Sequence, residues 1–368
     1  MKNTIKLIIA SFLIVGVFSC NEQQKSKNEE IKFDFEQIYA LGFKGDMSVI
    51  LELLDSVNNK DLTNEQISLK EKYYKRFREQ NEKYDCETND SLVINIVEIF
   101  HSYWRTVLLD DKVIENADTA LKNKLADLLY ENYISNEISR DSLIENLYNY
   151  LPEALKQKGY YSNAMGKTAK FYDLHLWTKE TEKIYEINLP ETKVEVKVIF
   201  MEDFISTGWL DYMSFGEFYA GGWALKDALY CVKKSYDISS ESFHVSYLTH
   251  EAQHFADYKS FPLLEQPDLE YRAKLTELCM AKETAYELIS KFIRGADKKT
   301  KEYAHQFANY CIIRDLSKEI YNQEFITDTT EWKKISYKEI NNASIKLIKQ
   351  NTANLNILGA ETVTALIK

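Results

Sequence analysis

The hydrophobic pattern changes its period twice along the chain, and these changes limit the folds that the chain can adopt. Apolar residues recur at helical spacing from residue 31 to about 160, and again from about 240 onward. Between about 170 and 235, apolar and polar residues alternate, which is typical of half-buried strands. The pattern therefore predicts an α+β fold that is mostly α, with a helical N-terminal bundle followed by a unit that has a small sheet and C-terminal helices.

Individual elements and boundaries follow from the same patterns. The clearest helical patterns of the N-terminal part lie at 46–54, 91–109, 120–133 and 141–155. Strands are expected at 183–189, 193–200, 218–224 and, after a turn at Lys226 and Asp227, at 228–232. The predicted parts of the chain are a signal peptide at 1–19, a tether at 20–30, a helical domain at 31–165 and a second domain at 166–368.

The charge balance limits the partners of the protein. The chain has 57 acidic and 46 basic side chains, which gives a formal net charge of −11. Binding to nucleic acid requires a clustered positive surface. The sequence therefore predicts that nucleic acid is not a partner.

The first 20 residues have the pattern of a targeting signal. Lys2 and Lys6 precede an apolar run at 7–18, which is too short to span a bilayer as a mature helix. The run ends in VFSC at Cys20, which resembles the lipobox of bacterial lipoproteins, where the Cys is lipidated and becomes the first mature residue. The resemblance implies a lipid anchor in a membrane of the bacterial cell envelope. The alternative is a plain secretory signal with an incidental Cys.

The residues after Cys20 also bear on location. Residues 21–30 are polar and lack aromatic side chains, so they are expected to form a flexible tether. Residue 21 is Asn rather than Asp, which by resemblance to the Gram-negative sorting rule favours the outer membrane.

Four cysteines remain beyond the signal: Cys86, Cys231, Cys279 and Cys311. They are far apart and show no CxxC spacing, so the sequence does not support a cysteine zinc site. Disulfides are compatible with an oxidising compartment, but the sequence favours buried free thiols.

The most informative residues are His250-Glu251-Ala252-Gln253-His254, an HExxH motif. On a helix, residues four apart lie on one face, so both imidazoles can bind one metal ion. Glu251 can then reach a water in the open coordination position and accept its proton. The alternative is an accidental match, because the motif is short.

The context of the motif resembles the zincin metallopeptidases, whose active-site helix packs under a small twisted sheet. Ser240 is a suitable N-cap for the helix, and the strand-rich stretch precedes it. The resemblance implies zinc as the cofactor and a peptide or protein as the substrate. It also implies an edge strand that binds the substrate backbone, and the Gly221-Gly222-Trp223 strand or its hairpin partner is the candidate.

The residues after His254 distinguish the branches of this family. Asp257 and Ser260 stand where the metzincin pattern requires Gly and His, so that branch is excluded. The gluzincin branch instead takes its third ligand from a Glu on a later helix. Such a helix is expected after the loop that contains Pro262 and Pro267.

Asp268 is expected to be the N-cap of that later helix, which carries Glu270 in its first turn and Glu277 on the same face two turns on. The resemblance favours Glu270 as the third zinc ligand, because gluzincins place it early in the helix near a small residue, here Ala273. Glu277 is the alternative ligand, or else it supports a ligand from behind. Lys274 departs from the family, which has Asp at that position.

Other residues near the motif are considered for supporting roles in the site. Asp257 shares a face with both motif histidines, so it either orients one of them or caps the helix. Tyr303 and His305 are candidates to stabilise an oxyanion, as a downstream His or Tyr does in some gluzincins. His244 is expected to be an ordinary core or surface residue.

Together these features predict a lipid-anchored metallopeptidase-like hydrolase that cleaves peptide bonds with a zinc-activated water. In this prediction His250, His254 and Glu270 bind zinc and Glu251 is the catalytic base. The alternative from another class is a non-catalytic binding or structural lipoprotein of the cell envelope with a vestigial HExxH.

Cys20→Ala tests the anchor. The substitution should abolish lipid labelling and release or mislocalise the protein, because it removes the thiol that would carry the lipid. Metabolic labelling and membrane fractionation measure both effects. Unchanged fractionation would leave only an ordinary signal peptide.

Overall fold

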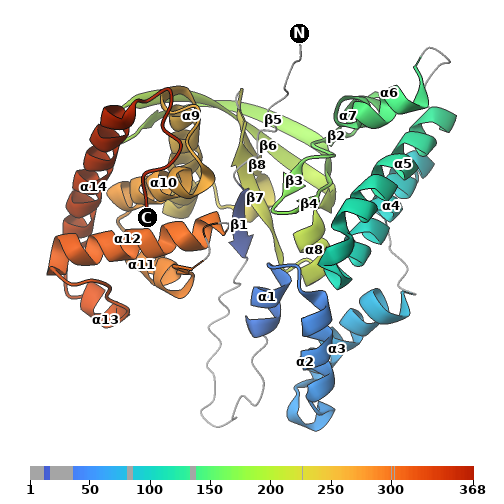
Figure 1. The fold of residues 1–368 in the computed structure, drawn as a ribbon, viewed down its shortest axis with the longest axis horizontal. Helices are drawn as coiled ribbons and strands as arrows, with labels where there is room; N and C mark the ends of the chain where they lie inside the picture. The colour runs from blue at the N-terminus through green and yellow to red at the C-terminus, as the bar shows by residue number, and fades with distance from the viewer. Residues whose placement is uncertain are drawn as a thin grey trace. The chain divides into compact units, whose positions relative to one another are not determined.

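The computed structural model describes residues 12–16, 36–80, 86–132, 138–225, 227–299, 301 and 303–368 (Figure 1). These residues belong to two compact units. The first contains Ile14–Lys179 and Met201–Ala220, and the second contains Glu180–Phe200 and Gly221–Lys368, with the gaps just given. The units thus do not divide at residue 165, because two long strands run through both. Cys20, the predicted tether and Lys226 lie outside the described residues.

The first unit is built mainly from helices. They are α1 (Glu36–Gly42), α2 (Met47–Ser56), α3 (Asn64–Tyr74), α4 (Ser91–Leu109), α5 (Ile114–Asn132), α6 (Arg140–Glu145), α7 (Leu147–Gln157) and α8 (Trp209–Ser214). A π-helical turn, η2 (Lys75–Glu79), extends α3, and η1 (Asn59–Asp61) and η3 (Asp111–Val113) are single 3₁₀ turns. Apolar side chains of these helices form one continuous core.

The predicted bounds of the helices in this unit agree with the structure to different degrees. α4 has the predicted bounds, because its buried residues follow a regular helical stripe and Asp90 caps its first turn. α5 begins six residues before the predicted start at 120. The predicted helix at 141–155 is two helices, α6 and α7, which meet at Asn146. The Asn146 side chain donates to the carbonyl of Ser142, an Asn contact that competes with helix continuation.

α4 is long and apolar enough to cross a membrane, by length and composition alone. Core helices of water-soluble proteins pass the same test. Here the apolar face of α4, which includes Ile96, Phe100 and Trp104, is buried in the core of the first unit. We therefore assign α4 to the core.

The sheet confirms the predicted strand-rich stretch. Its strand order is β1-β7-β8-β6-β5-β2, with β1 at Phe12–Gly16, β2 at Tyr161–Ser162, β5 at His175–Asn188, β6 at Lys193–Thr207, β7 at Phe218–Ala224 and β8 at Leu229–Val232 (Figure 1). β3 (Lys167–Thr168) and β4 (Phe171–Tyr172) form a separate pair. β5 and β6 are longer than predicted, and β7 lies between β8 and β1, so the Gly221-Gly222-Trp223 strand is not an edge of this sheet.

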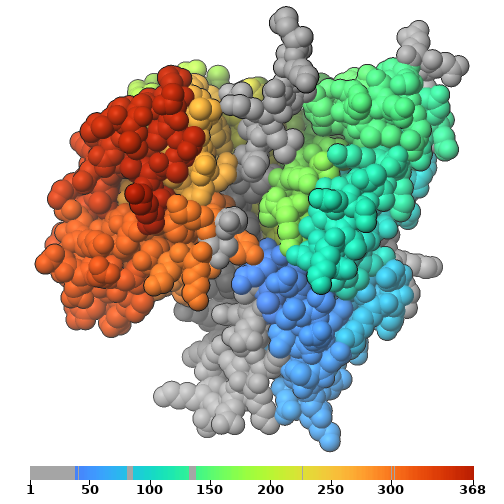
Figure 2. Space-filling view, viewed as in Figure 1, coloured from blue at the N-terminus to red at the C-terminus, as the bar shows by residue number. Residues whose placement is uncertain are grey.

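The second unit holds the motif helix and the C-terminal helices. They are η5, a π-helix at Phe243–Thr249, followed by α9 (His250–Ser260), α10 (Gln266–Met280), α11 (Ala285–Arg294), α12 (Ala304–Tyr321), α13 (Thr329–Trp332) and α14 (Tyr337–Leu358), and a 3₁₀ turn, η4 (Lys233–Ser235), precedes η5. α10 is central, since it packs against α9, α12 and α14. Figure 2 shows the orange and red side chains of the C-terminal helices as one continuous surface. The mostly α, α+β prediction is confirmed.

Of the two predicted N-caps, one is correct. The Ser240 hydroxyl accepts a hydrogen bond from the Phe243 NH at 3.1 Å, as a cap does. α10, however, begins at Gln266, and Asp268 lies inside its first turn. Pro267 is compatible with a first turn, because the missing NH has no helical partner there. Asp268 instead accepts hydrogen bonds from the NH groups of Leu366 and Ile367.

Among the described cysteines, Cys231, Cys279 and Cys311 are free thiols, as predicted. Cys231, Cys279 and Cys311 are buried and Cys86 is half-buried. Burial raises the pKa of both the Cys279 and the Cys311 thiol to about 12, so these groups stay neutral and poorly reactive at neutral pH.

Gly222 permits the close approach of β7 to the helix that carries the motif. A Cβ at this position would lie 2.4 Å from Cε2 of Tyr247 in η5 and 2.5 Å from the Tyr230 carbonyl oxygen. Both distances are shorter than any normal contact. The strand and η5 can therefore pack this closely only around a residue without a side chain.

Gly222→Ala should lower the thermal midpoint, because relieving the overlap moves Tyr247 or the strand, and overpacking costs about 1–3 kcal/mol. Differential scanning calorimetry measures the change. Gly166→Ala is the matched control, since its Cβ would meet only the Asn163 carbonyl at 3.4 Å. Equal midpoints for the two variants would contradict the packing described here.

Candidate metal centre

Three side chains from two helices meet in the second unit: His250 and His254 from α9, and Glu270 from α10. One ligand atom of each lies within 4.8 Å of the others. His250 Nε2 and His254 Nε2 are 3.1 Å apart, and Glu270 Oε1 is 3.3 Å from His254 Nε2. We call these residues the His-His-Glu cluster. All three are buried.

The spacing and chemistry of the cluster fit zinc. Zinc binds imidazole nitrogen and carboxylate oxygen at about 2.0–2.2 Å, so two ligand atoms of a tetrahedral site lie roughly 3.3–3.5 Å apart. The distances in the cluster, between 3.1 and 3.6 Å, are close to this spacing. Two histidines and one carboxylate are also a donor set of catalytic zinc sites, which keep the fourth position open.

Glu277 supports His250 from behind. His250 Nδ1 donates a hydrogen bond of 2.7 Å to Glu277 Oε1, seven residues after Glu270 on α10. The bond fixes the tautomer in which Nε2 carries no proton and points into the cluster. The same bond outweighs the effect of burial and lowers the pKa of Glu277. The structure thus places Glu277 behind a histidine and Glu270 within the cluster. Lys274 is buried, with its ammonium 4.9 Å from the Phe292 ring centre.

Glu251 is buried beside the cluster. Neither of its carboxylate oxygens has a hydrogen-bond partner within normal distance among the described residues. Burial, together with the charges of Glu270 and Glu277, raises the pKa of Glu251 to about 8, although the charge of His254 and the backbone NH of Ala224, at the end of β7, act the other way. A buried carboxyl without a full set of hydrogen bonds is costly, and the described residues supply Glu251 with none of normal length, so this position is suited to a partner such as water or substrate.

His305 adds a second contact to Glu270. Its Nδ1, at the start of α12, lies 2.8 Å from Glu270 Oε2. Burial alone would raise the pKa of Glu270, but the charges and hydrogen bonds of His305 and His254 hold it well below its usual range. The gluzincin resemblance suggests His305 only as a group that stabilises an oxyanion. Its observed contact is with the predicted ligand, which it holds in place.

Asp257 has a different role from the one expected. Its carboxylate accepts hydrogen bonds from Arg272 Nε at 2.8 Å and from Gln253 Nε2 at 2.9 Å, and from neither motif histidine. Thr276 also donates to Gln253, at 3.1 Å. Asp257 therefore ties α9 to α10 and does not orient an imidazole.

The two remaining candidates are not among the residues of the cluster. His244 and Tyr303 are exposed. The sequence did not single out Tyr258, although this residue contacts the cluster. Its ring stacks on the His254 ring with the ring centroids 6.2 Å apart. It follows His254 by four residues, so the helical spacing carried a signal for this contact.

No protein-family model matches the chain, and no curated protein or solved structure matches it either.

Metal content across two glutamate variants tests the cluster. The chain without residues 1–20 should hold about one zinc, and Glu270→Ala should empty the site because it removes a ligand oxygen. Glu277→Ala should weaken zinc binding by about 10–100-fold, since the ligand itself remains. Plasma emission spectrometry after dialysis against a weak chelator measures both.

Glu283→Ala is the matched control, because Glu283 is exposed in the turn after α10. Loss of zinc from Glu277→Ala but not from Glu270→Ala would reverse the two assignments. Full zinc content in both variants would contradict a metal site here.

Proposed function

We propose that the protein is a zinc-dependent hydrolase that cleaves peptide bonds and is tethered by a lipid to the bacterial cell envelope. The observation that carries the proposal is a buried glutamate whose carboxylate oxygens make no hydrogen bond of normal length to the described residues, beside three convergent ligand atoms. A structural metal site does not require an additional carboxylate beside its ligands. The combination therefore supports a hydrolytic site better than a structural one.

Each residue of the centre has a distinct task in this proposal. When bound, zinc polarises a carbonyl group and lowers the pKa of water. Glu251 accepts the proton of the attacking water and passes it to the leaving nitrogen. Glu277 keeps His250 in the correct tautomer, and His305 holds Glu270. These two supports set the directions of the His250 and Glu270 ligand atoms.

An extended peptide is the substrate that the sheet favours. β7 ends at Ala224, the residue whose NH faces Glu251. In the structure an extended segment, β1, lies beside β7, and it belongs to the predicted signal peptide. Removal of that signal would leave the backbone groups of β7 to pair with another extended chain. A substrate strand there would run beside the general base.

His305 marks a side from which the centre can be reached. Its side chain is 32% exposed, whereas Glu270, which it contacts, is 1% exposed. Solvent therefore reaches within one side chain of the cluster on the α12 side.

Glu251→Gln separates catalysis from metal binding. The amide cannot accept the proton, so peptide cleavage should fall by about 10²–10⁴-fold while zinc content and fold stay as in the wild type. Mass spectrometry of a mixed library of unstructured peptides measures cleavage, and emission spectrometry measures zinc.

Glu287→Gln, an exposed substitution on α11, is the control for the change of charge. Cleavage that persists at the wild-type rate in Glu251→Gln would overturn the assignment of the base. A wild-type chain that holds zinc but cleaves nothing would favour the non-catalytic alternative.

A further inference from the structure

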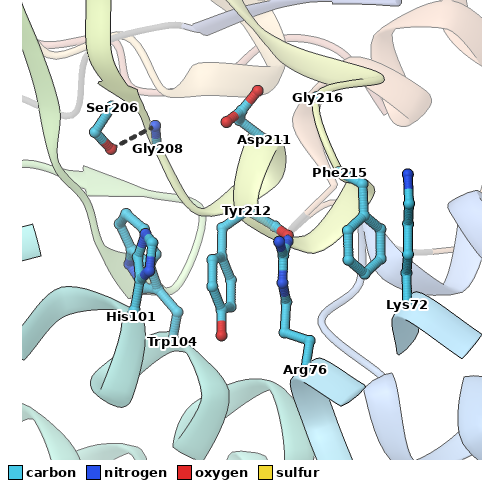
Figure 3. Close-up of a pocket in the computed structure, with 10 residues that line it drawn as sticks. All are labelled: Lys72, Arg76, His101, Trp104, Ser206, Gly208, Asp211, Tyr212, Phe215 and Gly216. Atoms are coloured by element: carbon cyan, nitrogen blue, oxygen red, sulfur yellow. Dashed lines mark hydrogen bonds between the residues drawn. The ribbon is translucent and has the colours of Figure 1, made fainter. Parts of the chain in front are cut away.

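A cavity of about 360 Å³ in the first unit is lined by side chains that contact one another. Arg76 lies between the rings of Tyr212 and Phe215, with its guanidinium carbon 4.5 and 4.0 Å from the two ring centres (Figure 3). One of its donors also binds the Tyr212 carbonyl oxygen. Because these groups have partners within the chain, we assign no ligand to this cavity.

Residues 363–368 of the second unit, which we call the C-terminal strap, return from the end of α14 to the helix that carries Glu270. Figure 1 shows this segment in dark red, between α14 and α10. The NH groups of Leu366 and Ile367 both donate to Asp268 Oδ1, each at 3.0 Å. Asp268 is buried in the first turn of α10, two residues before Glu270. The strap is therefore bonded to α10 directly before the predicted zinc ligand.

Apolar and backbone contacts fix the strap in this position. Val363 is buried in a small cluster that includes Leu269 of α10, and Ile367 is buried in the larger core that α10 and α12 share. The NH of Glu265, the residue before α10, donates to the Thr364 carbonyl oxygen at 2.8 Å. The strap is thus part of the packed interior of the second unit.

The strap also reaches α10 on the other side of Glu270, by way of α12. Arg314 of α12 donates to the Lys368 carbonyl oxygen and, through Nε at 2.8 Å, to Asp315 Oδ1. Asp315 Oδ2 in turn accepts a hydrogen bond of 2.9 Å from the Tyr271 hydroxyl. Since Tyr271 directly follows Glu270, the predicted ligand lies between two points of α10 that are tied to the strap.

These ties bear on the direction of the Glu270 carboxylate. Its Oε2 lies 2.8 Å from Nδ1 of His305 in α12, so the carboxylate depends on the spacing of α10 and α12, which the strap joins. The ligand atoms of a working metal site are held within about 0.5 Å of their productive positions. We propose, on the basis of the metal site of the proposed function, that Asp268 is a positioning residue that aims Glu270 at the two histidines by holding the strap.

Asp268→Ala removes the acceptor of both strap bonds but no zinc ligand. In the chain without residues 1–20, it should raise the zinc Kd by about tenfold, the lower end of the loss for groups that support a ligand from behind. Asp268→Asn should stay close to the wild type, because both NH groups bind one oxygen and the amide keeps an oxygen there. Competition with a chromophoric zinc chelator measures the Kd of each variant.

Asp328→Ala is the matched control, because the Asp328 carboxylate also accepts a backbone NH, that of Thr330 at 2.8 Å, but lies at the start of α13. Its zinc Kd should equal that of the wild type. Because Asp268 is buried, Asp268→Ala is first checked by circular dichroism. If that variant does not fold, Arg314→Gln decides, since it removes the bond to the Lys368 carbonyl from a partly exposed position and should raise the zinc Kd several-fold.

Hydrogen exchange of the zinc-free chain gives a readout that does not depend on metal. Mass spectrometry should show faster exchange across residues 266–272 in Asp268→Ala than in the wild type or Asp268→Asn. Unchanged exchange there, or a wild-type zinc Kd in folded Asp268→Ala, would overturn the proposal, as would an equal loss of affinity in Asp268→Asn or Asp328→Ala. A wild-type chain that binds no zinc would instead overturn the proposed function, and the exchange rates would still decide whether the strap holds α10.

Discussion

The buried ion pair between Asp257 and Arg272 is the interaction on which the metal centre depends. It joins α9, which carries both histidines, to α10, which carries Glu270. Arg272 also donates to Asn351 and Thr352, so α14 is held by the same side chain. Removing one partner of such a buried pair costs about 3–5 kcal/mol, because the other charge is left uncompensated. The relative position of the two helices, and hence of the three ligand atoms, follows from this contact.

The packing of η5 and α9 against the sheet is the second constraint on the metal centre. η5 is π-helical over the seven residues before His250, and Thr249 Oγ1 bonds the His244 carbonyl five residues earlier. π-helical turns are rare and occur often at functional sites. Together with the close contact at Gly222, this turn sets where Glu251 lies against the end of β7. Glu251 and the two histidines are thus positioned by different contacts of one continuous helical segment.

Local patterns predicted what depends on neighbouring residues. The helix at 91–109, the Ser240 cap and the shared face of His250 and His254 all follow from helical spacing. The preference for Glu270 over Glu277 came from a family resemblance, and the cluster has the geometry which that preference requires. What could not be predicted depends on distant contacts: Asp268 binds the C-terminal segment, His305 reaches Glu270 from α12, and Arg76 meets rings more than 130 residues away. No short-range period encodes such pairs.

Anomalous X-ray diffraction on crystals of the chain without residues 1–20, with data on both sides of the zinc absorption edge, tests the central claim most directly. The account predicts a single zinc peak between His250 Nε2, His254 Nε2 and a carboxylate oxygen of Glu270, with Glu277 on the far side of the His250 ring. Zinc bound elsewhere, or a cluster that stays without an anomalous peak in crystals grown with zinc, would contradict it.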